Sequence, residues 1–150
     1  MAWLAWQAPE KLAARRIDQG LWLLLGGMLG GRLAHVAMAW PYYAGRLFEI
    51  PQVWLGGFSG AGALAGGLLA LMLLAYTTRQ PLGELADVYL PLAAVLGVSG
   101  WLACWWDGCA YGPETTAWWG LPARDEWGEL ASRMPLQLLA AFLTLALFWL

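Results

Sequence analysis

The chain has 150 residues, of which 61% are hydrophobic and 12% are charged, whereas a soluble domain carries about 25% charged residues. Its formal net charge is −2 and no basic patch stands out, which argues against nucleic-acid binding. Its glycine-rich stretches lack the Lys-Ser/Thr ending of a phosphate-binding loop. The composition therefore predicts an integral membrane protein.

Residues 1–19 are expected to form a cytoplasmic or interfacial segment. Trp3 and Trp6 lie ahead of a group of basic residues, a pattern typical of a segment on the membrane surface. The basic residues are Lys11, Arg15 and Arg16. No obvious cleavage site follows them, so we expect no cleaved signal peptide.

Residues 20–150 are expected to form one transmembrane domain. Four stretches are almost free of charge: residues 20–40, 52–76, 84–106 and 134–150. Spanning the hydrocarbon core takes about 20 helical residues, with a usual range of about 17–25, so the last stretch is at the lower limit. Helices satisfy their own backbone polar groups in lipid. The predicted fold class is an all-α integral membrane protein, a bundle of four transmembrane helices.

The placement of charge predicts that both termini are cytoplasmic. Basic residues precede the first stretch, and Arg79 lies in the short link between the second and third. With four spans, these segments share a side with the C-terminus, and the positive-inside rule makes that side cytoplasmic. Residues 112–132 then form an outer loop between the third and fourth helices. This loop mixes tryptophans with charged residues, which is typical of a docking surface.

The chain contains 12 tryptophans, most of them near the ends of the predicted helices. Such rings favour the headgroup region, where both the apolar ring and the indole N–H are satisfied. We interpret them as an interfacial belt. A surface that contacts a pigment or a quinone is the alternative.

Glycines spaced four residues apart predict close packing between the first and second helices. Small residues at this spacing let two helix backbones approach each other in lipid. The glycines concerned are Gly26, Gly27, Gly30, Gly31, Gly56, Gly60, Gly62 and Gly66.

Ionisable residues inside the spans are candidate functional residues, because a charge at mid-bilayer costs at least ~2.5–3.5 kcal/mol. Arg32 lies in the first helix, and His35 follows one turn later on the same face. We expect Arg32 either to join helices, with Glu49 or Asp107 as its partner, or to bind an anionic lipid headgroup. His35 has no carboxylate at catalytic spacing, which favours a simple hydrogen-bonding role.

Cys104 and Cys109 lie five residues apart at the outer end of the third helix. In a continuous helix this spacing points them to different faces, so we expect two free thiols. A helix break at Asp107 and Gly108 would permit a disulfide instead. No Cys/His ligand set accompanies them, so no metal site is expected.

Five segments resemble the bacterial prolipoprotein diacylglyceryl transferases, in family order. The segment from Leu85 to Pro91 is similar to the family's Leu-Ala-Asp-x-x-x-Pro, and the segment from Gly100 to Gly112 to its Gly-Arg-x-Gly-Cys-Phe-x-x-Gly-Cys-Cys-Tyr-Gly. The others are Gly30-Gly31-Arg32-Leu33, Trp54-Leu55-Gly56-Gly57-Phe58-Ser59 and Arg133-Met134-Pro135-Leu136-Gln137-Leu138. The resemblance implies transfer of a diacylglyceryl group from phosphatidylglycerol to a prolipoprotein cysteine.

The chain departs from the family pattern where that chemistry would be done. The family histidine position is Ala61, and the family arginine position is Trp101. These changes remove a candidate base for the thiol and a clamp for the departing phosphate. Losing one such electrostatic contact costs ~100–1,000-fold in rate. We also expect no counterpart here of the family's first helix or of the region after its fifth span. We therefore assign no catalytic residue and expect a truncated, catalytically degenerate member.

The resemblance also implies a retained lipid-binding site, with a bound phospholipid and no cofactor or metal. Its candidate residues are Arg32, His35, Ser59, Asp107, Tyr111 and Arg133.

Three functions follow as hypotheses for a protein of the bacterial cytoplasmic (inner) membrane. The first is a lipid-binding or structural subunit of a larger membrane complex, in contact with phosphatidylglycerol and other membrane polypeptides. The alternative is an active minimal diacylglyceryl transferase that uses a reorganised site. A lipid transporter is a weaker alternative.

Overall fold

The computed structural model describes residues 10–125 and 127–149, in two compact units, Met1–Val88 and Tyr89–Leu150. The boundary between the units falls within a long helix, α5 (Leu82–Asp107). The predicted interfacial position of Trp3 and Trp6 concerns residues outside the described ranges.

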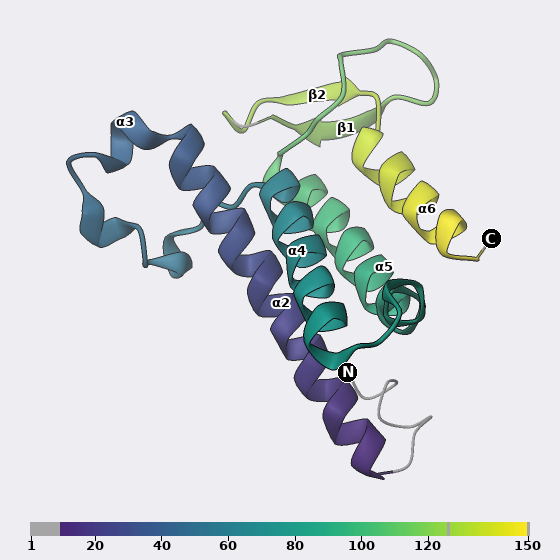
Figure 1. Ribbon diagram of the computed structural model, residues 1–150. Helices are drawn as coiled ribbons and strands as arrows, with labels where there is room; N and C mark the ends of the chain where they lie inside the picture. Colours follow the sequence, from purple (N-terminus) through teal and green to yellow (C-terminus); the bar gives the residue numbers. More distant parts are fainter. Residues whose placement is uncertain (1–9, 126, 150) are drawn as a thin grey trace. The chain divides into compact units, whose positions relative to one another are not determined.

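The first unit is built on two long helices joined by an irregular connection. Its elements are α2 (Glu10–Met38), α3 (Trp40–Tyr43), two 3₁₀ turns, η1 (Leu47–Glu49) and η2 (Val53–Leu55), α4 (Gly60–Thr78) and the start of α5. Figure 1 shows α2 and α4 side by side. Helix α2 begins well before the predicted start at residue 20, and α4 begins after the predicted start at residue 52.

Local signals set both ends of α4. The Ser59 hydroxyl accepts a hydrogen bond from the Gly62 N–H at 3.2 Å, so Ser59 caps the helix N-terminus. At the other end Arg79 adopts a left-handed conformation, with φ 54°, and its N–H donates to the Ala75 carbonyl. The apolar residues ahead of Ser59 are therefore excluded from the helix.

Glycines allow α2 and α4 to pack in close antiparallel contact. A Cβ on Gly30 would lie 2.5 Å from the Gly62 carbonyl oxygen and 2.7 Å from the Gly66 Cα. Gly26 faces the same contact, where a Cβ would lie 3.0 Å from the Gly66 carbonyl oxygen. Gly60 lies outside this contact, because nothing approaches within 4 Å of its Cβ position. The glycines of the two helices thus fill one another's grooves.

We expect Gly66→Ala to destabilise the first unit by about 1–3 kcal/mol, because the new methyl group overpacks the helix contact. Its Cβ would lie 2.8 Å from the Gly30 Cα. Gly67→Ala is the matched control: its Cβ position is open, so the better helix propensity of alanine should stabilise the helix slightly. Unfolding in detergent measures both. Equal effects of the two variants would contradict the packing.

The second unit joins the end of α5 to a hairpin and a last helix. Its strands are β1 (Leu121–Arg124) and β2 (Leu130–Arg133), and its helix is α6 (Leu136–Trp149). The strands are antiparallel, with Leu121 opposite Arg133 and Arg124 opposite Leu130. The prediction of an all-α fold is therefore corrected, because the loop at residues 112–132 contains strand. An Asp125-x-x-Gly128 turn connects the strands, and aspartate and glycine are favoured at its first and last positions.

Three described helices are long and apolar enough to cross a membrane: Leu12–Met38, Gly60–Thr78 and Leu82–Asp107. The fourth predicted span is shorter than expected. Helix α6 has 14 residues, which gives about 21 Å of helix, less than the ~30 Å hydrocarbon core. The four-span bundle therefore remains a prediction, as does the cytoplasmic position of both termini.

The spans expose their apolar side chains rather than bury them. Only 17%, 6% and 11% of the most apolar windows of the three helices is buried within the chain. Leu64, for example, is 72% exposed. Lipid is the solvent that covers such faces at low free-energy cost.

Candidate functional site

Arg32 is buried in α2, with 5% of its surface exposed, and its guanidinium binds the connection between α2 and α4. All five guanidinium N–H bonds point to backbone carbonyls. Nε donates to Ile50 at 2.8 Å, Nη1 to Gly56 and to Gly57 at 3.0 Å, and Nη2 to Glu49 at 2.6 Å and Gln52 at 3.4 Å. Arg32 therefore fixes residues 49–57 against the helix, and it reaches Glu49 through the backbone.

An aromatic and an imidazole ring complete the surroundings of Arg32. The Arg32 guanidinium lies 5.5 Å from the ring centroid of Tyr43, which is 6% exposed. The half-buried His35 ring meets Tyr43 edge-on at 6.1 Å. A Cβ on Gly57 would lie 2.6 Å from His35 Nε2, so this glycine, with φ 77°, lets the connection approach the imidazole. The first unit thus brings together two predicted site residues, Arg32 and His35.

Ser59 and Ala61 lie at the start of α4. The Ser59 N–H donates to the Gly31 carbonyl at 3.0 Å, so Ser59 ties the two helices together besides capping α4. Ala61 is exposed on the first turn of α4.

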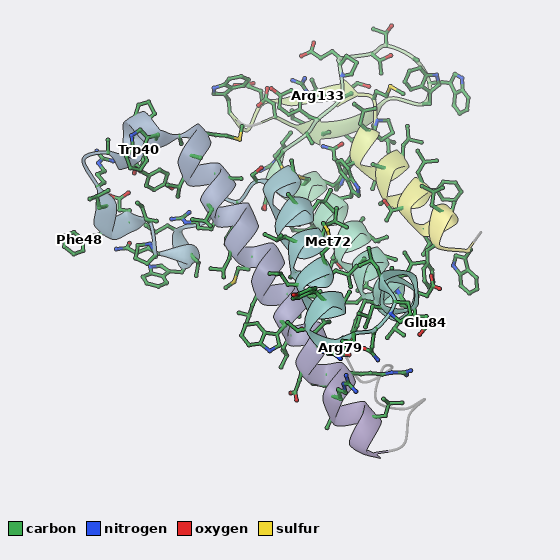
Figure 2. All side chains as sticks on the ribbon, viewed as in Figure 1. Trp40, Phe48, Met72, Arg79, Glu84 and Arg133 are labelled. Atoms are coloured by element: carbon green, nitrogen blue, oxygen red, sulfur yellow. A yellow bond between two sulfur atoms is a disulfide. The ribbon has the colours of Figure 1, made fainter. Side chains whose placement is uncertain are left out.

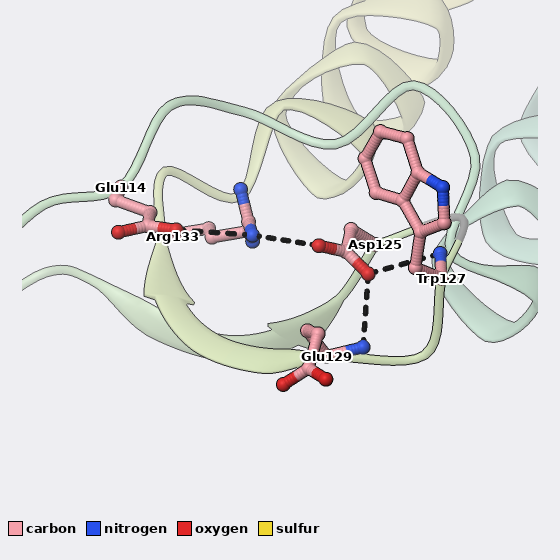
Figure 3. A network of polar contacts seen from close by, with 5 residues as sticks. All are labelled: Glu114, Asp125, Trp127, Glu129 and Arg133. Atoms are coloured by element: carbon pink, nitrogen blue, oxygen red, sulfur yellow. Dashed lines mark hydrogen bonds and ion pairs between the residues drawn. The ribbon is translucent and has the colours of Figure 1, made fainter.

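Arg133 is the centre of the polar cluster in the second unit (Figure 3). It is 7% exposed, and its Nη2 forms ion pairs with Asp125 at 3.1 Å and with Glu114 at 3.2 Å. Its guanidinium also lies 4.8 Å from the ring centroid of Tyr111. Two predicted site residues, Arg133 and Tyr111, are therefore in contact.

Asp125 has a part in this cluster that sequence reasoning missed. It is 7% exposed, and its Oδ1 accepts from the N–H groups of Trp127 at 3.0 Å and Glu129 at 2.9 Å. Asp125 therefore holds the hairpin turn and Arg133 at once. The Asp-x-x-Gly turn signal was visible in the sequence, but its ion-pair partner was not.

Gln137 is a second missed residue, at the first turn of α6 and 1% exposed. Its Nε2 donates to the Cys109 carbonyl at 2.8 Å, which fixes the orientation of the amide. Its Oε1 and the Nε of Arg133 are buried without a hydrogen-bond partner among the described residues. The second unit thus buries one donor atom and one acceptor atom whose hydrogen-bonding capacity no described residue uses.

Cys104 and Cys109 form a disulfide, so the prediction of two free thiols is wrong. Helix α5 ends at Asp107, and Gly108 adopts φ 72°, which turns the chain back. The two Cα atoms therefore lie 4.7 Å apart, within disulfide range. Asp107 is exposed at the end of α5, and Trp101 is half-buried within it.

The long apolar helices define the chain as a membrane protein of mainly helical structure. All of it, residues 1–150, matches the sequence profile of the family described as prolipoprotein diacylglyceryl transferase. The chain therefore belongs to the prolipoprotein diacylglyceryl transferase family, and its relatives are bacterial.

Three relatives are named phosphatidylglycerol–prolipoprotein diacylglyceryl transferase. The protein of Synechococcus elongatus is 36% identical over 119 residues, which cover 75% of this chain and 41% of the relative. The protein of Thermosynechococcus vestitus is 30% identical over 113 residues, which cover 75% of this chain and 41% of the relative. The protein of Mycobacterium leprae is 34% identical over 120 residues, which cover 77% of this chain and 36% of the relative. The chain thus spans about two fifths of the length of these curated relatives.

Proposed function

We propose that this chain takes part in diacylglyceryl transfer at the bacterial cytoplasmic membrane, with phosphatidylglycerol and a prolipoprotein as substrates. Relatives of that name, at 30–36% identity, support this alternative over the degenerate-subunit hypothesis. Under the positive-inside rule, the link that contains Arg79 is cytoplasmic and residues 39–59 lie on the outer side.

The observation that carries the proposal is a pair of buried polar atoms in the second unit that have no hydrogen-bond partner among the described residues. Arg133 Nε is a donor with a positive charge, and Gln137 Oε1 is an acceptor. A phosphatidylglycerol headgroup carries a phosphate, which accepts, and hydroxyls, which donate. Within the second unit, Arg133 would bind the lipid phosphate, and Gln137 would receive a glycerol hydroxyl.

His35 is the group in this chain best suited to activate the thiol, because it is the single histidine. In the proposed step the imidazole accepts the thiol proton. The cysteine sulfur attacks the carbon of the diacylglyceryl group that is bonded to the phosphate oxygen. A carbon–sulfur bond forms, the carbon–oxygen bond to phosphate breaks, and glycerol phosphate leaves with the bonding electrons. His35 would thereby replace the histidine that the family pattern places at Ala61.

The test is transfer to a fluorescent lipobox peptide in vesicles that contain phosphatidylglycerol. We expect transfer by the chain and at least a ~100-fold lower rate for His35→Gln, the size of a general-base contribution. Tyr76→Phe, at a side chain that is 83% exposed, is the control and should keep the parent rate. A folded chain without transfer, which also fails to rescue a transferase-depleted strain, would refute the proposal.

The second candidate is a non-catalytic, lipid-binding subunit of a membrane complex, favoured by Ala61 and Trp101 at the family's polar positions. It predicts binding of phosphatidylglycerol without transfer, together with partner polypeptides in mild detergent. Because the glycines of α2 and α4 already fill one another's grooves, partners would contact the Gly112–Ser132 region instead. A homogeneous monomer of 16.4 kDa would count against this candidate.

A further inference from the structure

Residues 39–59, here called the connecting segment, turn their bulky apolar side chains outward. Phe48 is 89% exposed and Trp54 is 76% exposed, and Figure 2 shows Phe48 projecting away from the ribbon. Leu47, Leu55 and Trp40 are also more than half exposed, at 57%, 62% and 52%. This side-chain pattern is the reverse of that of a loop in water, where polar groups face the solvent.

The two charged side chains of the connecting segment are both engaged by Tyr42. The Tyr42 hydroxyl donates to Glu49 Oε2 at 2.8 Å. The Arg46 guanidinium lies over the Tyr42 ring, 4.5 Å from its centroid. Such local partners lower the cost of moving these charges towards a less polar medium.

Part of the connecting segment's backbone is hydrogen-bonded from within the protein, by its own turns and by Arg32. Irregular backbone is excluded from lipid because its unpaired N–H and C=O groups each cost several kcal/mol. Here Arg32 donates to five carbonyls between residues 49 and 57. The polar edge of the segment therefore faces the buried guanidinium, while its apolar side chains face out.

We propose that the connecting segment is inserted into the lipid leaflet next to the end of α2, with Phe48 and Trp54 among the acyl chains and headgroups. The bilayer is the occupant that the surface fits, because the segment continues the exposed apolar face of a candidate span, Leu12–Met38. Leu33 and Met38, near the end of that helix, are 63% and 81% exposed. Arg32 is then the residue that makes this insertion possible.

The test uses the full chain in vesicles of phosphatidylcholine and phosphatidylglycerol. Phe48→Cys introduces one free thiol for an environment-sensitive fluorophore, since Cys104 and Cys109 are bonded to each other. Phe48 is 89% exposed, so we expect the substitution to leave the fold in place. Gly83→Cys is the control, at an exposed position with open space in the first turn of α5.

We expect blue-shifted emission at position 48, strong quenching by spin-labelled lipid and at least several-fold weaker quenching by aqueous iodide than at position 83. Iodide quenching at position 48 equal to that at position 83 would overturn the proposal. Protection from both quenchers would also overturn it, since protein would then cover the segment. Trp54→Cys should repeat the result for Phe48→Cys. None of these outcomes depends on transferase activity.

Discussion

Replacing Arg32 by methionine is expected to remove about 5 kcal/mol or more from the stability of the first unit. The change leaves five backbone carbonyls without their donor, and each buried unsatisfied group costs about 1–3 kcal/mol. The expected result is loss of the ordered connecting segment. Thermal unfolding in detergent and protease sensitivity of residues 44–58 measure it.

Arg32→Lys and Arg46→Met make this prediction specific. An ammonium has three donors, so lysine leaves at least two of the five carbonyls unpaired and should be destabilising despite its charge. Arg46 is exposed over the Tyr42 ring, and its loss should cost less than about 1 kcal/mol. If Arg32→Lys is as stable as the parent chain, the charge matters and the five carbonyl bonds do not.

Replacing Arg133 by methionine should cost the second unit about 3–5 kcal/mol, because it leaves the buried Asp125 carboxylate without its cationic partner. Glu114→Gln removes the other ion pair, whose carboxylate side chain is 69% exposed, and should cost about 0–1 kcal/mol. Unfolding in detergent separates the two variants.

A double-mutant cycle isolates the contact between Arg133 and Asp125. Asp125→Asn keeps an oxygen that can accept from the turn N–H groups and removes the charge. Combined with Arg133→Met, it should recover part of the stability, because no unpaired charge stays buried. Strict additivity of the two single changes would contradict a coupled pair.

Hydropathy predicted the bounds of the third apolar stretch well and the start of the second stretch poorly. The third stretch, predicted at residues 84–106, agrees closely with Leu82–Asp107. The second stretch was extended too far, because residues 52–59 are apolar without being helical. Gly56 and Gly57 adopt positive φ there, and Ser59 caps the helix. Serine is a common helix-capping residue, but a hydropathy average does not detect a cap.

The disulfide shows what spacing alone leaves open. Cys104 and Cys109 diverge on an ideal helix, and they meet because α5 stops at Asp107. The glycine at position 108 marked a possible break. Whether the helix continues past it depends on what the next residues contact, and here the Cys109 carbonyl accepts from Gln137.

The sequence by itself determined the membrane class, the positions of the long apolar helices and the family. Hydropathy is a sum over neighbouring residues, and a family motif is a short run of neighbouring residues. Both therefore depend only on residues that are close in sequence. Only the tertiary structure decided how Arg32 and Arg133 are compensated. Arg32 is paired with backbone carbonyls, which every residue type has, so no sequence motif marks them. Arg133 is paired with Asp125 because the pairing of β1 with β2 brings the two side chains together. Contacts across a fold depend on where distant segments meet, which local composition does not encode.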